Sequence, residues 1–267
     1  MVRTVVAGIA GRMGSRIAQL VRETEGLELA GGFEHPGHPS VNHDISEVIG
    51  GPPSGLKVAA GIHAVLPDAD VVVDFTSASV SLSHLKEAAS RGKAMVIGST
   101  GFSRDQVEQA REYASRVPCV LAPNMSMGVN VLFKVVGDVA KLLGEGFDVE
   151  IIEAHHRYKK DAPSGTALKL AGVVSDALGR DLDQVGVYAR KGITGERTSQ
   201  EIGIQTIRGG DIVGEHTVIF AGLGERIEIT HRAQSRDNFA RGAIRAALWV
   251  GRQPPGLYDM EHVLGIR

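Results

Sequence analysis

The sequence predicts an α/β fold, with an N-terminal Rossmann-type parallel-sheet domain and a C-terminal α+β domain that carries an open mixed or antiparallel sheet. Strand and helix signals alternate through the first half of the chain, which is typical of parallel strands joined by helices. From Gly203 onward, strand-like runs are separated by glycine-containing turns, which favours a meander. The pattern changes near Met125. The first domain is therefore expected to comprise residues 1–126 and 236–267, and the second residues 127–235.

In the first half, short apolar runs predict buried strands, and apolar residues three and four positions apart predict helices. In chain order, the expected strands are Thr4–Ala7, Leu27–Phe33, Lys57–Ala59, Asp70–Phe75, Ala94–Ile97 and Cys119–Ala122. The expected helices are Met13–Arg22, Ile45–Ile49, Ser79–Arg91 and Ser103–Arg116. In such a sheet, the loops at the carboxyl ends of the strands face the ligand crevice.

In the second half, the helices are longer and the strands alternate between polar and apolar residues, as half-buried strands do. Helices are expected at Val129–Leu143, Ser164–Leu178 and Asn238–Trp249. Strands are expected at Asp148–Ala154, Gly203–Arg208, His216–Ala221 and Arg226–Arg232. The last three strands form the predicted meander.

Composition and charge exclude several classes of protein. The formal net charge of -2 does not favour binding to nucleic acid or to an acidic membrane surface. The single cysteine, Cys119, cannot form an internal disulfide, which fits a reducing compartment. No stretch approaches the ~20 apolar residues that span a bilayer, and the apolar run at the N-terminus is too short for a signal peptide. We therefore expect a cytoplasmic protein.

The first expected strand leads into a glycine turn, Gly8-Ile9-Ala10-Gly11-Arg12-Met13-Gly14, and a helix follows. In this setting, glycines allow a tight turn and a close approach by a dinucleotide, whose pyrophosphate lies on the N–H groups of the helix start. Ala10 stands where the usual fingerprint has a second glycine. Glycines also occur at ordinary strand-to-helix junctions, so this turn alone is a weak signal.

An acidic residue at the end of the second expected strand strengthens the interpretation. Glu34 follows Gly14 by 20 residues (34 − 14), and a carboxylate there can accept hydrogen bonds from the adenosine ribose hydroxyls. The alternative is a solvated glutamate at a strand end. The carboxylate would repel the 2′-phosphate of NADP, and His35, mostly neutral at pH 7, would not offset it. We therefore expect NADH to be used at least as well as NADPH.

Two more loops follow expected parallel strands. Gly98, Ser99 and Thr100, with Gly101, follow Ala94–Ile97. Their small size would let the backbone reach a flat nicotinamide ring, although an ordinary turn explains them equally well. Ala122, Pro123, Asn124 and Met125 follow the next strand in the same kind of place.

The densest group of reactive side chains runs from Glu153 through His155-His156 and Lys159 to Ser164-Gly165-Thr166-Ala167. Adjacent residues of an extended chain point to opposite sides, so the two histidines need different roles. Pro163 and Ser164 are typical helix-start residues, and the N–H groups of the following turn would point outward. A cationic loop that leads into a helix start suits a small carboxylate ligand.

Other interpretations of this segment are weaker. A histidine pair can bind metal, but no second cluster and no His-Glu-x-x-His spacing is present, so no metal is expected. A basic run is usually a solvated face, and Ser164-Gly165-Thr166 could be only a helix cap. The elbow Gly-x-Ser-x-Gly of serine nucleophiles is absent.

Over nearly its full length, the chain resembles the 4-hydroxy-tetrahydrodipicolinate reductases, also called dihydrodipicolinate reductases, of the diaminopimelate route to lysine. The resemblance rests on the glycine turn, the two loops after the parallel strands and, above all, the segment Glu153-Ala154-His155-His156 through Lys159 to Asp161-Ala162-Pro163-Ser164-Gly165-Thr166-Ala167. The last segment is highly specific for this family.

The resemblance implies roles for the residues that match its motifs. His155 is implied as proton donor or acceptor, Lys159 as proton donor, and His156, Gly165 and Thr166 as ligands of the substrate carboxylates. The implied cofactor contacts are Gly8 to Met13, Glu34 and His35, with Gly98 to Thr100 and Ala122 to Met125 at the nicotinamide end. Some members have arginine at the position of His35, which puts strong NADPH use in doubt.

The resemblance further implies a homotetramer built from the sheet of the second domain, a small dicarboxylate substrate and hydride transfer followed by proton delivery from a general acid. Two other classes stay open on the residues alone. One is another Rossmann-type oxidoreductase acting on an amino or hydroxy acid. The other is a non-catalytic NADH-sensing protein, which would not need the His-His-x-x-Lys loop.

Overall fold

The computed structural model describes residues 1–266, which form two compact units. Unit 1 consists of Met1–Met127 and the residues from Asp237 onward, and unit 2 of Gly128–Arg236. Each unit has a sheet of its own, in the order β12-β6-β5-β4-β1-β2-β3 in unit 1 and β11-β10-β7-β9-β8 in unit 2. No helix of residues 1–266 is long and apolar enough to cross a membrane.

The sheet of unit 1 is parallel throughout, as the alternating pattern predicts. Its strands are β1 (Val2–Ala7), β2 (Leu27–Glu34), β3 (Ala59–Ala60), β4 (Val71–Asp74), β5 (Ala94–Ile97), β6 (Pro118–Leu121) and β12 (Gly256–Tyr258). The central strands β4 and β5 are fully buried, because helices cover both faces of the sheet. The edge strand β12 was not predicted, since three residues are too few to show a pattern.

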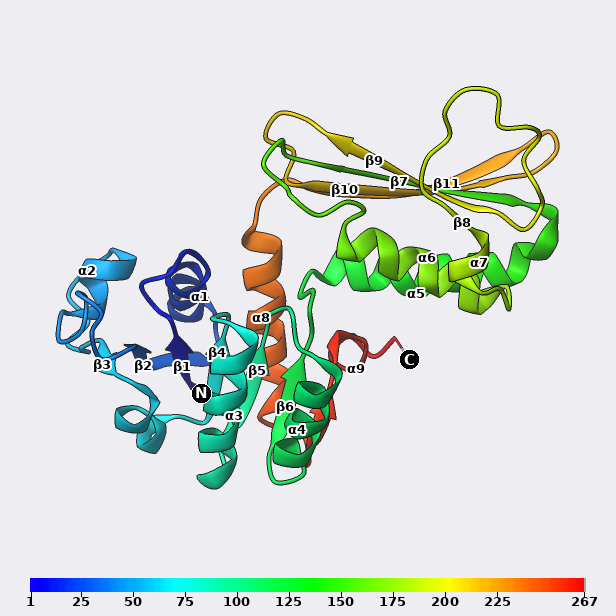
Figure 1. Ribbon diagram of the computed structural model, residues 1–267. Coiled ribbons are helices and arrows are strands. Elements are labelled where there is room, and N and C mark those ends of the chain that lie inside the picture. The colour runs from blue at the N-terminus through cyan, green and yellow to red at the C-terminus, as the bar shows by residue number, and fades with distance from the viewer. Residues whose placement is uncertain (267) are drawn as a thin grey trace. The chain divides into compact units, whose positions relative to one another are not determined.

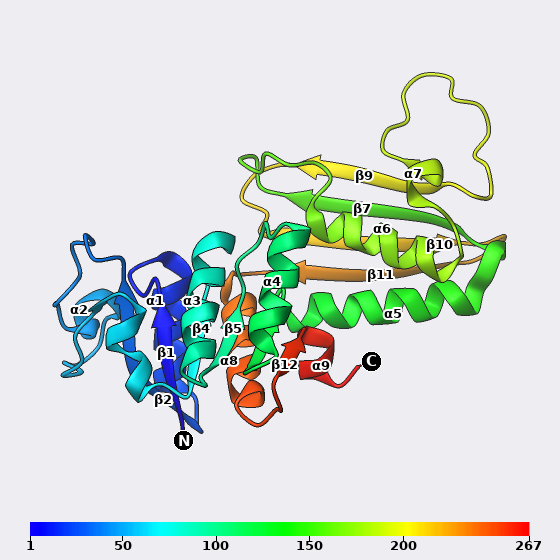
Figure 2. The ribbon, with the colours of Figure 1, turned by 60° about the horizontal axis from the view of Figure 1, so that its bottom comes forward.

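Helices lie on both faces of this sheet (Figures 1 and 2). One apolar cluster joins the sheet to α1 (Arg12–Glu23) and α8 (Asp237–Val250), and a second joins its other face to α3 (Ala78–Ser90) and α4 (Arg104–Ala114). The remaining helices are short: α2 (Ile45–Ile49), α9 (Met260–Leu264) and the 3-10 turns η1 (Ile62–Ala64) and η2 (Leu66–Asp68). The carboxyl ends of the strands are thereby left open for a ligand.

The sheet of unit 2 is mixed. Its strands are β7 (Asp148–His155), β8 (Gly186–Val187), β9 (Ile202–Arg208), β10 (Gly214–Ala221) and β11 (Arg226–Ala233). β7 pairs in parallel with β9 and antiparallel with β10. The helices α5 (Met127–Leu143) and α6 (Gly165–Ala177) cover one face of the sheet, around a core that includes Ile151, Ile204 and Val218. The short α7 (Leu182–Val185) and the 3-10 turn η3 (Gly144–Gly146) complete the unit.

The predicted meander is wrong in one respect. β10 and β11 do form an antiparallel hairpin, but β9 is not beside β10, because β7 lies between them. The connection from β7 to β9 runs through α6 and returns the chain parallel to β7, as helical crossovers do. The turn at Gly209-Gly210 is compatible with a hairpin between β9 and β10. The local sequence could not reveal that this loop instead crosses β7 and joins the two strands on either side of it.

Candidate active site

The glycine turn connects β1 to α1, and its shape depends on two glycines. Gly8 has a φ of 61°, a conformation that glycine adopts without strain. A side chain at Gly14 would place its Cβ 2.0 Å from the carbonyl oxygen of Gly8. No side chain caps the N-terminus of α1. The first N–H groups of α1 have no intrahelical partner, and the cap residue Gly11 has no side chain to accept from them. Such a helix start suits the binding of an anion.

A pocket of about 360 Å³ lies at this turn. The expected cofactor contacts that line it are Gly8, Ala10, Gly11, Arg12, Met13 and Glu34. The Glu34 carboxylate accepts a hydrogen bond of 2.8 Å from the Ala10 N–H group, which anchors it beside the turn. The pocket, the uncapped helix start and this carboxylate fit a dinucleotide.

Two other expected cofactor contacts, Ile9 and His35, do not line this pocket. Ile9 is fully buried in the apolar core. His35 is exposed and does not line the pocket, whereas His38 does. The two rings contact each other edge to face, with 5.5 Å between centroids.

A buried carboxylate beneath the turn was not predicted as part of the site. Asp74 at the end of β4 accepts hydrogen bonds from Thr76 Oγ1 (2.6 Å), Ser81 Oγ (2.8 Å) and His84 Nδ1 (2.7 Å). The Ser81 hydroxyl also lies 2.7 Å from Ser99 Oγ. Burial alone would raise the pKa of Asp74, but the bonds from His84 and Thr76 lower it. This network ties Ser99 to the strand beside the glycine turn.

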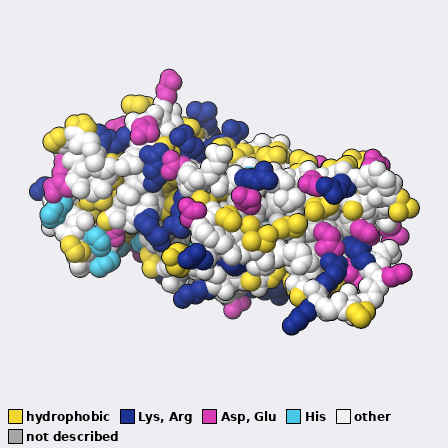
Figure 3. All heavy atoms as spheres, turned by 90° about the horizontal axis from the view of Figure 1, so that it is seen from above, with side chains coloured by type: hydrophobic (Ala, Val, Ile, Leu, Met, Phe, Trp, Pro, Cys, Tyr) yellow, Lys and Arg dark blue, Asp and Glu magenta, His cyan; other side chains and the backbone are white. Residues whose placement is uncertain are grey.

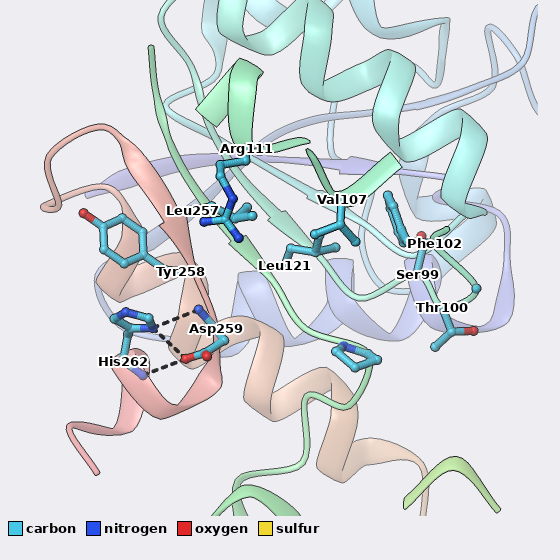
Figure 4. Close-up of a pocket in the computed structure, with 12 residues that line it drawn as sticks. Ser99, Thr100, Phe102, Val107, Arg111, Leu121, Leu257, Tyr258, Asp259 and His262 are labelled. Carbon is cyan, nitrogen blue, oxygen red and sulfur yellow. Dashed lines mark hydrogen bonds and ion pairs between the residues drawn. The ribbon is translucent and has the colours of Figure 1, made fainter. Parts of the chain in front are cut away.

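A second pocket, of about 410 Å³, includes Ser99, Thr100 and Pro123 from the two predicted loops. Figure 4 shows Val107, Leu121 and Arg111 toward its middle and Tyr258, Asp259 and His262 at one end. The α4, β12 and α9 residues are additions that the sequence did not suggest.

The remaining loop residues, Gly98, Ala122, Asn124 and Met125, line neither of these two pockets. Ala122 and Met125 are buried in the core, and Asn124 Oδ1 accepts a hydrogen bond of 2.9 Å from the Ser126 N–H group. A side chain at Gly98 would meet the Phe75 ring at 2.2 Å. Of the two predicted nicotinamide loops, Ser99, Thr100 and Pro123 line this second pocket.

In unit 2, the predicted reactive segment is organised around Glu153, whose side chain is completely buried. Its carboxylate accepts two hydrogen bonds of 2.8 Å from the Arg208 guanidinium. It also lies 2.6 Å from His155 Nδ1 and accepts 2.9 Å from the Ser164 N–H group. Burial would raise the pKa of Glu153, but these hydrogen bonds lower it to about 2. The carboxylate is therefore ionised at neutral pH.

His155 lies at the carboxyl end of β7 with its side chain 12% exposed. Burial lowers its pKa, and the neighbouring cations act in the same direction, while Glu153 opposes them. Lys159 is mostly buried, and its Nζ lies 2.8 Å from an oxygen of Asp161. His156 is half-buried, and its Nδ1 is buried without a hydrogen-bond partner in residues 1–266.

Ser164 is the N-cap of α6, and its hydroxyl accepts a hydrogen bond of 3.2 Å from the Ala167 N–H group. Gly165 and Thr166 occupy the first two positions of the helix, as predicted from the Pro-Ser pair. The same hydroxyl lies 3.0 Å from Nε2 of His216, a buried histidine of β10. The helix start therefore lies in the same cluster as His155.

The roles of Glu153, Arg208 and His216 were missed. Glu153 left a signal, because it is in phase with Val149 and Ile151 on the inward face of an alternating strand, where a carboxylate needs partners. Arg208 and His216 left none, since their proximity depends on β9 and β10 flanking β7. Together, the cluster presents a carboxylate-held imidazole, a lysine and a helix start, which can bind carboxylates and transfer a proton.

Two family models match the chain: "Dihydrodipicolinate reductase, N-terminus" over residues 2–125 and "Dihydrodipicolinate reductase, C-terminus" over residues 128–264. A relative from Syntrophobacter fumaroxidans, named 4-hydroxy-tetrahydrodipicolinate reductase, is 76% identical over 267 residues and covers 100% of both chains. A relative of the same name from Syntrophus aciditrophicus is 56% identical with the same coverage.

Among solved structures, the fold is similar to that of a dipicolinate-bound dihydrodipicolinate reductase from Paenisporosarcina sp. TG-14. The TM-score is 0.75 at 24% identity, covering 97% of each chain. An amine dehydrogenase from Mycobacterium smegmatis shares the fold at a TM-score of 0.61 and 15% identity, covering 97% of this chain and 95% of the other. The family models span both units and the relatives match end to end, so the chain belongs to the dihydrodipicolinate reductase family.

Proposed function

We propose that this chain reduces 4-hydroxy-tetrahydrodipicolinate to tetrahydrodipicolinate with NAD(P)H and loss of water, in the diaminopimelate pathway of lysine biosynthesis. Membership in the family supports this, because full-length relatives carry the name of this activity. The observation that carries the proposal is the cluster of unit 2, in which one buried carboxylate holds both His155 and the start of α6.

The proposed substrate is a cyclic imine with two carboxylates. Loss of water gives a conjugated imine, a hydride adds to the ring carbon that lost its oxygen, and the adjacent carbon takes up a proton. Bound NAD(P)H supplies the hydride. The chain itself must bind two carboxylates and deliver the proton, which a positioned general acid does.

We assign proton transfer to His155 and Lys159, and carboxylate binding to His156, Gly165 and Thr166. The side chains of His155 and Lys159 are each mostly buried and belong to one charged cluster. Lys159 pairs with Asp161, so a substrate carboxylate would compete with that ion pair. The first turn of α6 offers backbone N–H groups to a carboxylate at the positive end of the helix dipole.

The activity is tested by NADH oxidation, with the substrate generated from pyruvate and aspartate semialdehyde by a condensing aldolase. We expect rapid loss of NADH absorbance with the wild-type chain. The variants His155→Gln and Lys159→Ala should each lower kcat by about 10²–10⁴-fold, the contribution of a general acid. The Kd for NADH should change little. No turnover by the wild-type chain would refute the proposed function, and full kcat in both variants would refute the assignment.

We further propose that NADH is used at least as well as NADPH. The support is the Glu34 carboxylate in the pocket at the glycine turn, which would repel a 2′-phosphate. The kcat/KM values for the two cofactors measure the preference, and Glu34→Gln should shift it toward NADPH. A tenfold preference of the wild-type chain for NADPH would contradict this proposal.

Finally, we propose a cytoplasmic homotetramer assembled through the sheet of unit 2. The helices α5 and α6 cover only one face of this sheet. The other face carries partly exposed apolar side chains, among them Ile152, Ile207 and Ile219. Figure 3 looks onto this face, where hydrophobic side chains lie among charged ones of both signs. Analytical ultracentrifugation should give the mass of four chains, and Ile219→Lys should lower it.

A further inference from the structure

Glu153 is a buried ionised group to which the proposed reaction assigns no step. Its side chain has no exposed surface and lies on the same face of β7 as Val149 and Ile151, which pack in the apolar core. A buried charge is strongly unfavourable unless it is paired and hydrogen-bonded. The burial of this charge is therefore explained by the groups that the carboxylate binds.

Five donors surround this carboxylate. Oε1 accepts from Arg208 Nη2 (2.8 Å), the Ser164 N–H group (2.9 Å) and Thr206 Oγ1 (3.3 Å). Oε2 accepts from Arg208 Nη1 (2.8 Å) and His155 Nδ1 (2.6 Å). The two bonds from Arg208 form a bidentate pair, which fixes the plane of the carboxylate.

The bond to His155 determines which ring nitrogen carries the proton. An ionised carboxylate only accepts hydrogen bonds, so Nδ1 must be the protonated nitrogen. In the neutral ring, Nε2 then keeps its lone pair, and in the charged ring it becomes the donor. A side chain at Gly214 would place its Cβ 3.0 Å from Nε2, so glycine there leaves room at the nitrogen that takes up and gives away the proton.

The same carboxylate also determines where α6 begins. It accepts from the Ser164 N–H group, one residue before the turn that holds Gly165 and Thr166. Through Arg208, which donates a bond of 2.6 Å to the carbonyl oxygen of Asp161, it is connected to the loop of Lys159. Three groups that the proposed function places around the substrate thus share one anchor.

On the basis of the proposed function, we infer that Glu153 is a positioning residue that holds His155 as the Nδ1–H tautomer and sets its place relative to the start of α6. It touches no substrate in this role. A merely structural glutamate would stabilise unit 2 without determining the protonated nitrogen of His155 or the pH dependence of catalysis.

The tautomer is measured directly by ¹⁵N NMR of the histidine-labelled chain without substrate, with the His155 signals identified by their loss in His155→Gln. We expect Nδ1 to be protonated and Nε2 unprotonated in the neutral ring of the wild-type chain. An Nε2–H tautomer, or an equal mixture of the two, would overturn the inference. This outcome does not depend on turnover, so it is distinct from a failure of the proposed function.

The second test is Glu153→Gln, which keeps the size of the side chain but can donate an amide hydrogen to His155 Nδ1. We expect the Nε2–H tautomer to gain population and kcat to fall by about 10²–10⁴-fold, the range of a general acid that is lost. Because Glu153 favours the charged imidazole, the basic limb of the kcat/KM profile should move to lower pH in any residual activity.

Glu150→Gln is the matched control. Glu150 lies on the same strand but in the opposite phase, and Arg190 donates two hydrogen bonds to it, of 2.9 and 2.8 Å. This variant also loses a bidentate arginine pair, here a partly exposed one, and it should keep kcat and the His155 tautomer. Equal effects of the two variants on kcat and tautomer, or wild-type kcat in Glu153→Gln, would show that Glu153 has only a structural role. If Glu153→Gln does not fold, the tautomer of the wild-type chain decides.

Discussion

Acidification should destabilise unit 2 through His216. This side chain is 4% exposed, and burial, followed by the nearby His155, lowers its pKa to about 4. Its Nε2 contacts the Ser164 hydroxyl at 3.0 Å, while its Nδ1 is buried without a hydrogen-bond partner in residues 1–266. A charged ring would present a second N–H group at Nδ1 with nothing to accept it, so the folded state favours the neutral ring.

The sign follows from the lowered pKa. An unfolded chain has a histidine pKa of about 6.5, so between about pH 6.5 and pH 4 it binds more protons than the folded chain. The stabilisation is therefore complete above this range and is lost as the pH falls through it. With these two pKa values, the loss between pH 7.5 and pH 5 is about 2 kcal/mol.

Urea unfolding followed by far-UV circular dichroism measures this loss at the two pH values. His155 and His231 also have pKa values lowered by burial, so the wild-type chain should lose more than His216 alone accounts for. The variant His216→Gln keeps a polar group near Ser164 but does not titrate, so its loss should be smaller by about 2 kcal/mol. Equal losses in the two chains would refute the reasoning.

Three further outcomes are expected. Gly14→Ala should raise the Kd for NADH at least tenfold, because the new Cβ would meet the Gly8 carbonyl oxygen at 2.0 Å. Fluorescence titration measures this Kd. An unchanged Kd would contradict the tight turn. Gly172→Ala, inside α6 with nothing within 4 Å of the new Cβ, should instead stabilise the chain by about 0.5–1 kcal/mol in urea unfolding. Cys119 is fully buried, which raises the pKa of its thiol. It should therefore react with a thiol reagent only after unfolding. Fast reaction in the native chain would show that β6 is accessible to the reagent.

Much of unit 1 could be predicted because its signals are local. Continuous apolar runs such as residues 71–73 and Ala94–Ile97 identify strands buried on both faces, and parallel pairing follows from the helices between them. The ends of strands and helices were predicted less well. A pattern of apolar and polar side chains shows which face of an element is buried, but not the residue at which the element ends. The Asp74 network was missed, since its donors come from α3 and the loop after β4.

In unit 2, the sequence predicted the long strands and helices, but not the short β8 and α7 and not the order of the strands. The alternation in Asp148–Ala154 shows which side chains face inward, yet it does not show which strands lie beside β7. Arg208 and His216 are 55 and 63 residues from Glu153 (208 − 153 and 216 − 153). They reach it only because β9 and β10 flank β7.

The glycine turn, the acidic residue after the second strand and the segment from Glu153 to Ala167 were readable from the sequence, because each is a contiguous motif whose geometry depends on neighbouring residues. Only the tertiary structure showed that Arg208 neutralises Glu153 and that this one carboxylate holds both His155 and the start of α6. Those contacts depend on strand order and register, which result from the packing of the whole sheet against α5 and α6 and leave no mark in any single segment.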